Sequence, residues 1–418
     1  DTIEKLKQEY RKKDCVILYF IGLTESYEGE GYDRKNLKIP QNQEELLAEI
    51  AETVGKDHIA AISFGGAPMD FSFEKNVGAI LHMYLGGQAV GESVADLISG
   101  EVNPSGKLAE TIPFSEKDTP AWRYFAPPND DVEYRESIFV GYRYYETFHV
   151  PVKYPFGYGL SYTSFSYSEL SVPEVYSGGK IQIGFKIKNI GKVSGAEIAQ
   201  LYVCPNESDV IRSHIELKGF QKIYLHPGEE KEVILELDER SFSVYDVEKK
   251  AFSMLSGKYQ ICIGASVHDL QLKANMEVVG NSYFRNEREL FPDYFREQPH
   301  GMEISAEQFY QLLGGEPKHD KEKKRGEYTV YDSYQDVVNV SMFGKFVRGV
   351  VHIGLKIILR GKSERDPAFK MVKMGVEEGN LEGLIATSGG IATPKLIDML
   401  VYNANKKYLQ AFKRLLKK

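Results

Sequence analysis

An acidic loop near the start of the chain carries the side chains best suited to chemistry. Its sequence, LTESYEGEGYDRKNLKIP at residues 23–40, follows an apolar run and is rich in glycine. The carboxylates of the loop are Glu25, Glu28, Glu30 and Asp33, and the adjacent cations are Arg34 and Lys35. Carboxyl groups can serve as general acid, general base or nucleophile, and neighbouring like charges raise the pKa of a carboxyl group. The competing interpretation is a solvated loop whose shape is fixed by a structural pair of Asp33 and Arg34.

We predict no cofactor and no metal for this loop. Its acids do not follow the ligand order and central glycine of an EF-hand calcium loop. The Gly86-Gly87 turn completes neither a P-loop nor a dinucleotide-binding fingerprint. The three cysteines, Cys15, Cys204 and Cys262, lie far apart with no CxxC spacing, which indicates buried thiols in a reducing compartment, the cytoplasm.

The elements around the acidic loop predict an α/β fold with an open parallel sheet. The run CVILYFIG at 15–22 predicts a fully buried strand. Apolar residues at helical spacing predict a helix at 42–55, followed by strands at 58–64 and 77–85 and a helix at 86–100. Such alternation is typical of a parallel sheet covered on both faces. Ligands bind at the carboxyl ends of these strands, where the acidic loop is expected to lie.

Residues 160–280 follow a different pattern, an alternation of apolar and polar side chains. In KIQIGFKIKNIG, the apolar Ile181, Ile183, Phe185 and Ile187 fall on one face. Similar runs recur with short turns between them, which predicts an all-β sandwich. We interpret this module as a spacer or clamp rather than a catalytic unit.

The last ninety residues predict a mostly helical region after a charged, irregular stretch at 284–327. Polar side chains recur every three or four positions and form one stripe on an otherwise apolar helix; they are Lys345, Arg348, His352, Lys356 and Arg360. Five such groups exclude a membrane-spanning helix, and packing within a helical domain is favoured over an interfacial membrane helix, so a membrane partner is not expected. Thr393 and Pro394 are typical of a helix start.

Composition bounds the class of protein. The chain has 418 residues, of which 42% are hydrophobic, so it is globular and long enough for two to four domains. The net charge of −8 argues against a nucleic-acid partner, because phosphate contacts need a basic face. The chain begins at Asp1 inside a helix-like stretch, which is typical of a cut in a longer protein.

Four motifs, in order, carry a resemblance to a known family. They are EGEGYDRKNLKIP, MYLGGQAVGESVADLISGEVNPSGKLAETIP, FVGYRYYETFHVPVKYPFGYGLSYTSFSYSEL and ELKGFQKIYLHPGE. Across residues 10–280 the chain resembles glycoside hydrolase family 3, the β-glucosidase family. The resemblance implies the end of an α/β domain and a fibronectin type III-like sandwich, with the family's N-terminal TIM barrel missing from this chain. The implied divisions are 1–115 (α/β domain), 116–159 (linker), 160–283 (sandwich), 284–327 (charged linker) and 328–418 (helical extension).

The resemblance also implies a role for one carboxylate of the acidic loop. In the family, the Glu of a SGEGYDR-like stretch is the general acid/base, and here that position is Glu30, with Gly29 where many relatives have Ser. Glu28 is the rival position. Asp33 and Arg34 are expected to support the loop rather than to bind sugar, and together with Trp122 they are the candidates for a substrate contact.

The function that follows is that of a C-terminal fragment of a retaining exo-β-glycosidase acting on an oligosaccharide or β-glycoside substrate. A β-glucosidase is favoured, and the implied nucleophilic Asp lies on the missing barrel, so the chain alone is expected to be inactive. The alternatives are a β-xylosidase of the same family and a non-catalytic scaffold module.

Overall fold

The fold was analysed in a computed structural model of the chain. It describes residues 4–6, 15–29, 34–125, 132–206, 208–280, 286–316, 323–359 and 366–416. The chain divides into two compact units, one made of residues 1–21 and 37–317 and the other of residues 22–36 and 318–418. Most of the acidic loop, residues 23–36, therefore groups with the C-terminal helices rather than with the sheet whose first strand it follows.

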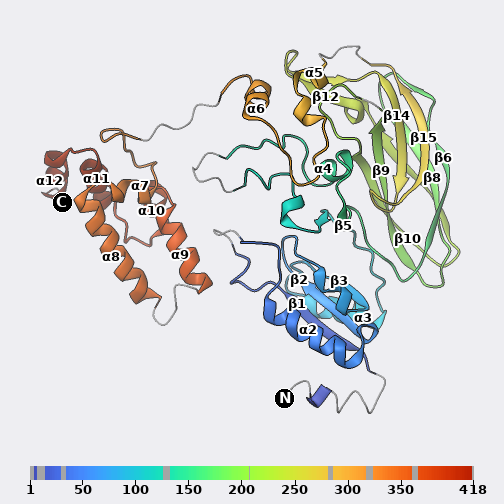
Figure 1. The fold of residues 1–418 in the computed structure, drawn as a ribbon, viewed down its shortest axis with the longest axis horizontal. Helices are drawn as coiled ribbons and strands as arrows, with labels where there is room; N and C mark the ends of the chain where they lie inside the picture. Colours follow the sequence, from blue (N-terminus) through green and yellow to red (C-terminus); the bar gives the residue numbers. More distant parts are fainter. Residues whose placement is uncertain are drawn as a thin grey trace. The chain divides into compact units, whose positions relative to one another are not determined.

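A small sheet of three strands opens the first unit (Figure 1). The strands are β1 (Ile17–Gly22), β2 (Ile59–Phe64) and β3 (Ala79–His82), in the order β1-β2-β3, and β2 runs parallel to β3. Helix α2 (Gln41–Val54) buries Leu47 and Ile50 and ends at Gly55, which adopts a φ of 85°. Helix α3 (Val90–Ser99) follows β3. The parallel sheet predicted from the sequence is confirmed.

Strand β1 differs from the prediction of a fully buried strand. Leu18 and Phe20 are 41% and 58% exposed, whereas Ile21 is buried. On its other side, the Tyr19 hydroxyl donates a hydrogen bond of 2.7 Å to the backbone carbonyl of Gln43 in α2. The prediction was wrong because β1 is the edge strand of this sheet and only one of its faces is covered among the described residues.

Residues 165–278 form the predicted β-sandwich. One sheet has the order β10-β9-β14-β15-β7 and the other has the order β11-β8-β6. The strands are β6 (Phe165–Ser171), β7 (Val175–Tyr176), β8 (Ile181–Asn189), β9 (Gly195–Pro205), β10 (Glu216–Leu225), β11 (Glu230–Leu237), β14 (Gly257–Gly264) and β15 (Leu270–Val278). Ile183, Phe185 and Ile187 lie in the core between the sheets, as the alternation predicts. A separate hairpin is formed by β12 (Ser243–Asp246) and β13 (Ala251–Met254).

The sandwich brings together two cysteines that are distant in sequence. Cys204 on β9 and Cys262 on β14 have their sulfur atoms 3.8 Å apart, and both are free thiols. Strands β9 and β14 are antiparallel neighbours, so the separation of 58 positions along the chain says nothing about the distance in space. Cys15 and Cys204 are partly exposed, whereas Cys262 is buried as expected.

A buried ion pair ties the segment after α3 to the sandwich. The Lys107 ammonium lies 3.0 Å from a carboxylate oxygen of Glu197 on β9, and their side chains are only 11% and 8% exposed. Lys107 also donates a hydrogen bond of 2.9 Å to the carbonyl of Gly159. Asn103 strengthens the same junction, because its side chain donates to the carbonyl of Ser194 and accepts from the backbone N–H of Tyr162.

The two segments that the sequence marks as linkers pack against each other. Helix α4 (Tyr142–Thr147) lies in the first segment, and α5 (Glu287–Leu290) and α6 (Ala306–Leu313) lie in the second. Their shared hydrophobic cluster includes Phe139, Tyr144, Tyr145, Phe291, Tyr294, Met302 and Phe309. Strands β4 (Ile112–Pro113) and β5 (Val152–Tyr154) pair with each other, and β5 follows α4 along the chain. These segments thus form a core of their own, while the domain boundaries stay a prediction.

The second unit contains the predicted helical region. Its helices are α7 (Tyr334–Asn339), α8 (Met342–Ile358), α9 (Pro367–Glu377), α10 (Leu381–Thr387), α11 (Pro394–Ala404) and α12 (Tyr408–Leu416). Thr393 caps α11 as predicted, because its hydroxyl accepts a hydrogen bond of 3.2 Å from the backbone N–H of Leu396. Val337, Val338, Val347, Leu381 and Leu400 belong to the core. Among the described residues, no helix has the length and apolar character needed to cross a membrane.

Candidate functional site

The described part of the acidic loop begins with a single helical turn directly after β1. The backbone N–H groups of Tyr27 and Glu28 both donate to the carbonyl of Thr24, at 2.8 Å and 3.0 Å. Glu25 is exposed on this turn, whereas Glu28 is partly buried. The turn therefore separates two carboxylates that the sequence places only three residues apart.

Arg34 lies at the other end of the loop and is partly buried. Burial lowers the pKa of its guanidinium, and the negative charge of Glu28 raises it. Since an arginine side chain stays protonated in proteins, Arg34 is a permanent positive charge close to Glu28. The sequence suggested Asp33 as the partner of Arg34, and the structure adds Glu28 as a carboxylate that interacts with it.

Glu30 and Asp33 lie outside the described residues. The expected role of Glu30 as general acid/base and that of Asp33 as a loop support therefore stay predictions. Within the ranges described, no group of three or more His, Cys, Asp or Glu side chains is arranged to hold a metal ion.

Trp122 lies in a turn after the short helix η3 (Glu116–Asp118), in the other compact unit from Arg34. It is 41% exposed, and its backbone N–H donates to the carbonyl of Thr119 at 3.2 Å. Nearby, the hydroxyl of Tyr124 donates to the carbonyl of Ile304 and accepts from its N–H, both at 2.9 Å. Tyr124 is thus engaged in structure, whereas the exposed ring of Trp122 remains available for contact.

A buried polar pair links β2 and β3 near their carboxyl ends. The hydroxyl of Ser63 and Nδ1 of His82 are 2.9 Å apart, and burial lowers the pKa of His82. The ring of Phe71 packs edge-on against His82 at a centroid distance of 5.3 Å. A serine and a histidine at hydrogen-bond distance can form a nucleophile and its base. Ser63 has no exposed surface, so this pair cannot reach a substrate and serves as support for the sheet.

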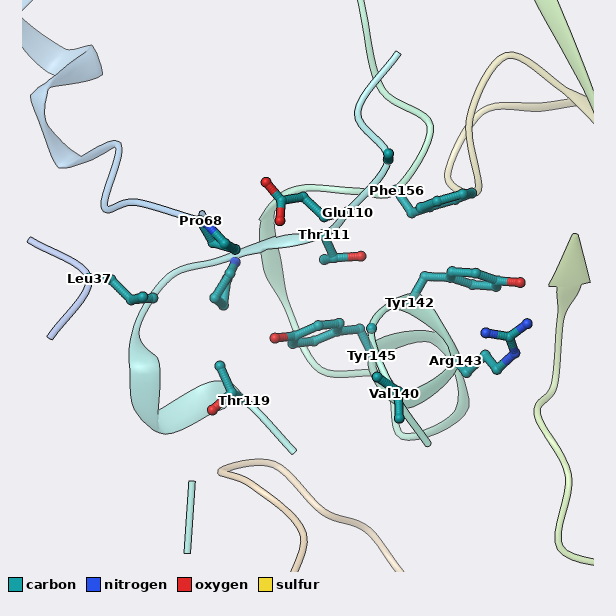
Figure 2. A pocket seen from close by; sticks show the side chains of 13 residues that line it. Leu37, Pro68, Glu110, Thr111, Thr119, Val140, Tyr142, Arg143, Tyr145 and Phe156 are labelled. Carbon is teal, nitrogen blue, oxygen red and sulfur yellow. The ribbon is translucent and has the colours of Figure 1, made fainter. Parts of the chain in front are cut away.

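A pocket that the sequence analysis missed lies where the segment after α3 meets α4. Its volume is about 380 Å³, and Figure 2 shows the rings of Tyr142, Tyr145 and Phe156 on its walls together with Glu110 and Thr111. Burial raises the pKa of Glu110, and its interaction with Tyr84 only partly offsets this. The only sequence signals were the stretches GKLAETIP and GYRYYET, which lie within two of the family motifs.

Of the polar groups of this pocket, the hydroxyl of Tyr142 is committed to the fold, whereas Thr111 Oγ1 is buried without a hydrogen-bond partner among the described residues. The hydroxyl of Tyr142 accepts a hydrogen bond of 2.9 Å from the backbone N–H of Leu217, and burial raises the pKa of both Tyr142 and Tyr145. Such a cavity is large enough for a small ligand. Among the described residues that line it, no second carboxylate accompanies Glu110, so they do not supply the pair that glycoside hydrolysis requires.

Two family models match separate parts of the chain. The Glycosyl hydrolase family 3 C-terminal domain matches residues 1–162, and the Fibronectin type III-like domain matches residues 197–267. The first match contains the acidic loop and the three-stranded parallel sheet, and the second falls inside the sandwich. Both matches extend over long stretches of the chain, so the family assignment does not rest on any single motif.

Similar proteins are longer than this chain. Thermostable beta-glucosidase B of Acetivibrio thermocellus is 43% identical over 280 residues, which cover 66% of this chain and 37% of that protein. The exo-alpha-(1->6)-L-arabinopyranosidase of Bifidobacterium longum is 37% identical over 269 residues, which cover 64% of this chain and 35% of that protein. The chain thus spans little more than a third of the length of these relatives.

Solved structures show the same partial coverage. The GH3 beta-glucosidase of Bifidobacterium adolescentis superimposes with a TM-score of 0.63 at 36% identity, over 68% of this chain and 42% of that one. Beta-glucosidase 3B of Thermotoga neapolitana, solved in complex with alpha-D-glucose, gives a TM-score of 0.61 at 34% identity, over 66% of this chain and 39% of that one.

Proposed function

Since this chain belongs to the glycosyl hydrolases of family 3 through a C-terminal domain and a fibronectin type III-like domain, we propose that it is the C-terminal part of a retaining exo-β-glycosidase. A β-glucosidase that releases terminal glucose is the favoured activity. The observation that carries this proposal is the family match over residues 1–162, which includes Glu30 and its loop. The similarity to the thermostable beta-glucosidase B supports the choice of sugar.

In this proposal Glu30 is the general acid/base and the nucleophile lies outside the chain. Retaining hydrolysis needs a carboxylic acid that protonates the leaving oxygen and a second carboxylate about 5–5.5 Å away that attacks the anomeric carbon. The negative charges of Glu25 and Glu28 would help to keep Glu30 protonated, while Arg34 would limit this effect by pairing with Glu28. Asp33 supports the loop, and Trp122 is the weaker candidate for a substrate contact.

Two alternative functions rest on observations other than the family match over residues 1–162. Sugar choice resides in groups outside the chain, so a β-xylosidase remains an alternative, and the similarity to an arabinopyranosidase adds a pentose-specific enzyme as a further candidate. A non-catalytic scaffold module is the alternative of another class. A start codon directly before Asp1 would favour the scaffold, whereas a barrel-coding region upstream in the same frame would favour the enzyme.

We expect the purified chain of residues 1–418 to have no glycosidase activity. Double displacement requires two carboxylates at one anomeric carbon, and the proposal places only Glu30 in this chain. The measurement is release of nitrophenol from p-nitrophenyl β-D-glucoside, with the Glu30→Ala chain as the matched control. The protein encoded by the full reading frame should be active in the same assay. Turnover by the chain well above that of the Glu30→Ala control would contradict the proposed division of the active site.

The three free cysteines support a cytoplasmic location for this enzyme. Cys204 and Cys262 are close enough to be oxidised together in an oxidising compartment, whereas a reducing compartment would keep them as thiols. This location is part of the proposal. Labelling of the thiols in intact cells, compared with lysed cells, would test it.

A further inference from the structure

Helix α8 exposes a continuous apolar stripe. Five large side chains along it are highly exposed: Met342 (85%), Phe346 (67%), Val350 (53%), Ile353 (60%) and Ile357 (65%). At 3.6 residues per turn these positions fall within about 80° of the helix circumference. The stripe therefore runs along the whole of the helix, which is about 25 Å long.

The side of α8 next to the stripe is anchored in the helical core. Val347 is buried in the cluster that also contains Val337 of α7 and Leu400 of α11, and Phe343 and Val351 pack against that cluster. The sequence analysis expected the apolar part of this helix to be packed. Only half of that apolar part is packed among the described residues, and the other half is the exposed stripe.

A cationic band borders the stripe on its other side. Lys345, Arg348, His352 and Lys356 are exposed and occupy a third sector of the helix. The guanidinium of Arg348 donates a hydrogen bond of 2.8 Å to the side-chain oxygen of Asn339, which fixes it on the surface of the unit. No acidic residue occurs between positions 337 and 363. The helix thus presents apolar and positive surface side by side.

Helix α12 repeats this combination. Its exposed apolar side chains are Tyr408 (56%), Leu409 (79%), Phe412 (59%), Leu415 (49%) and Leu416 (69%). Lys413 and Arg414 follow on the polar side, and Arg414 pairs with Asp398 of α11 at 2.8 Å. Two helices of one unit therefore each expose apolar side chains next to positive ones.

The charge of the helical region is opposite to that of the whole chain. Residues 323–418 contain 18 Lys or Arg and 9 Asp or Glu, whereas the whole chain has a net charge of −8. Large exposed apolar patches are rare on soluble monomers and mark interaction sites. An apolar face next to Lys and Arg is typical of helices that lie in the interface of a membrane containing anionic lipids.

From these observations we infer that α8 is a peripheral binding site for anionic phospholipid membranes, and that α12 presents a second surface of the same character. The apolar stripe would enter the boundary between headgroups and acyl chains, and the cations would contact the lipid phosphates. Val347 and the core beneath it would hold α8 in place, so no unfolding is required. The helix lies on the membrane and does not cross it, in agreement with the lack of a spanning helix among the described residues. This inference does not depend on the proposed glycosidase activity.

The test is co-sedimentation of the chain with liposomes at 150 mM NaCl. We expect the chain to pellet with phosphatidylcholine vesicles that contain 30% phosphatidylglycerol, and to pellet at least tenfold less with phosphatidylcholine alone. Raising the salt to 500 mM should also weaken binding, because the anionic surface is screened. A sample without liposomes corrects for self-association.

Two variants assign the binding to the stripe and to the cationic band. Phe346→Ser combined with Ile353→Ser should reduce pelleting at least tenfold, while circular dichroism and the melting temperature stay unchanged, because both side chains are exposed. Lys345→Ala should weaken binding about fivefold, the effect expected for one cation near an anionic surface. Phe220→Ser, which removes a 66% exposed ring from the sandwich, is the matched control and should have no effect.

Three results would overturn the inference. They are the absence of pelleting with anionic vesicles, equal pelleting with neutral vesicles, and binding that survives the double substitution. Gel filtration at increasing protein concentration distinguishes the main competitor. If the chain does not bind lipid but forms dimers that Phe346→Ser with Ile353→Ser dissociates, the stripe is an interface between two copies of the chain.

Discussion

In the proposed full-length β-glucosidase, Glu30→Gln should slow the hydrolysis of cellobiose about 10²- to 10⁴-fold. This is the usual contribution of a positioned general acid. A glutamine cannot replace it, because the amide has no acidic proton. The loss should depend on the leaving group. A dinitrophenyl β-glucoside needs little protonic assistance, so its first step should slow much less and should appear as a burst as the glycosyl-enzyme accumulates. Steady-state and burst kinetics with both substrates measure this difference.

Azide and a neighbouring carboxylate give the controls for Glu30→Gln. Azide attacks the glycosyl-enzyme without a general base, so it should restore turnover and yield a β-glycosyl azide of retained configuration. Glu28→Gln is the internal control and should have a mild effect, because the negative charge of Glu28 interacts with the positive charge of Arg34. If Glu28→Gln shows the azide rescue and Glu30→Gln does not, the acid/base is Glu28. If neither variant does, the loop has no proton-donor role.

Glu197→Ala should destabilise the junction between the segment after α3 and the sandwich by about 3–5 kcal/mol. This is the typical cost of removing one partner from a buried ion pair, because the remaining charge is left in a poor environment. Here the remaining group is the ammonium of Lys107, which is 11% exposed and would keep only the carbonyl of Gly159 as a described partner. The shift of the urea midpoint, followed by the circular dichroism of the sandwich, is the measurement.

An exposed pair provides the control for Glu197→Ala. Lys180 and Glu236 lie 2.7 Å apart at the surface of the sandwich, with side chains 73% and 51% exposed. Glu236→Ala should change stability by less than about 1 kcal/mol, because water screens such pairs. A double variant, Lys107→Met with Glu197→Leu, should cost less than Glu197→Ala alone, since it removes both charges. Equal costs for Glu197→Ala and Glu236→Ala would show that burial of the first pair has no energetic consequence.

The regular elements could be predicted because their patterns record which side chains share a face. The helical spacing of Leu47, Ile50 and Val54 matches the buried side of α2, and the alternation of Ile183 and Phe185 matches the core side of β8. The period of an apolar pattern shows which side chains share a face, but it does not show whether another element covers that face. Leu18 on β1 and Phe346 on α8 follow apolar patterns as regular as these and are exposed.

Other features could not be predicted from the sequence, because they depend on contacts between distant parts of the chain or on a single backbone angle. Cys204 and Cys262 became neighbours only through the pairing of β9 with β14, and Ser63 met His82 only through the pairing of β2 with β3. The stretch after Thr393 is apolar at helical period throughout, yet it folds as α11 and α12. Lys406, with a φ of 58°, interrupts it.

The candidate site could be predicted only in part. The physical chemistry of the loop indicated that its carboxylates could act as acid or base, and the choice of Glu30 among them came from the resemblance of EGEGYDR to a family motif. The electrostatic interaction between Glu28 and Arg34 could not be predicted from spacing, because the turn at Thr24 determines which carboxylate is partly buried.

The exposed side of β1 has a practical consequence for work with this chain in isolation. An edge strand with a free apolar side offers its backbone and side chains to another edge, so two molecules can pair edge to edge and aggregate. Leu18 and Phe20 would stay on one face of the joined sheet, where they add apolar surface for further association. A lysine at position 18 would place a charge on that side and discourage such pairing, without touching the face of β1 that contacts α2. Leu18→Lys is therefore a suitable background in which to purify the chain at high concentration.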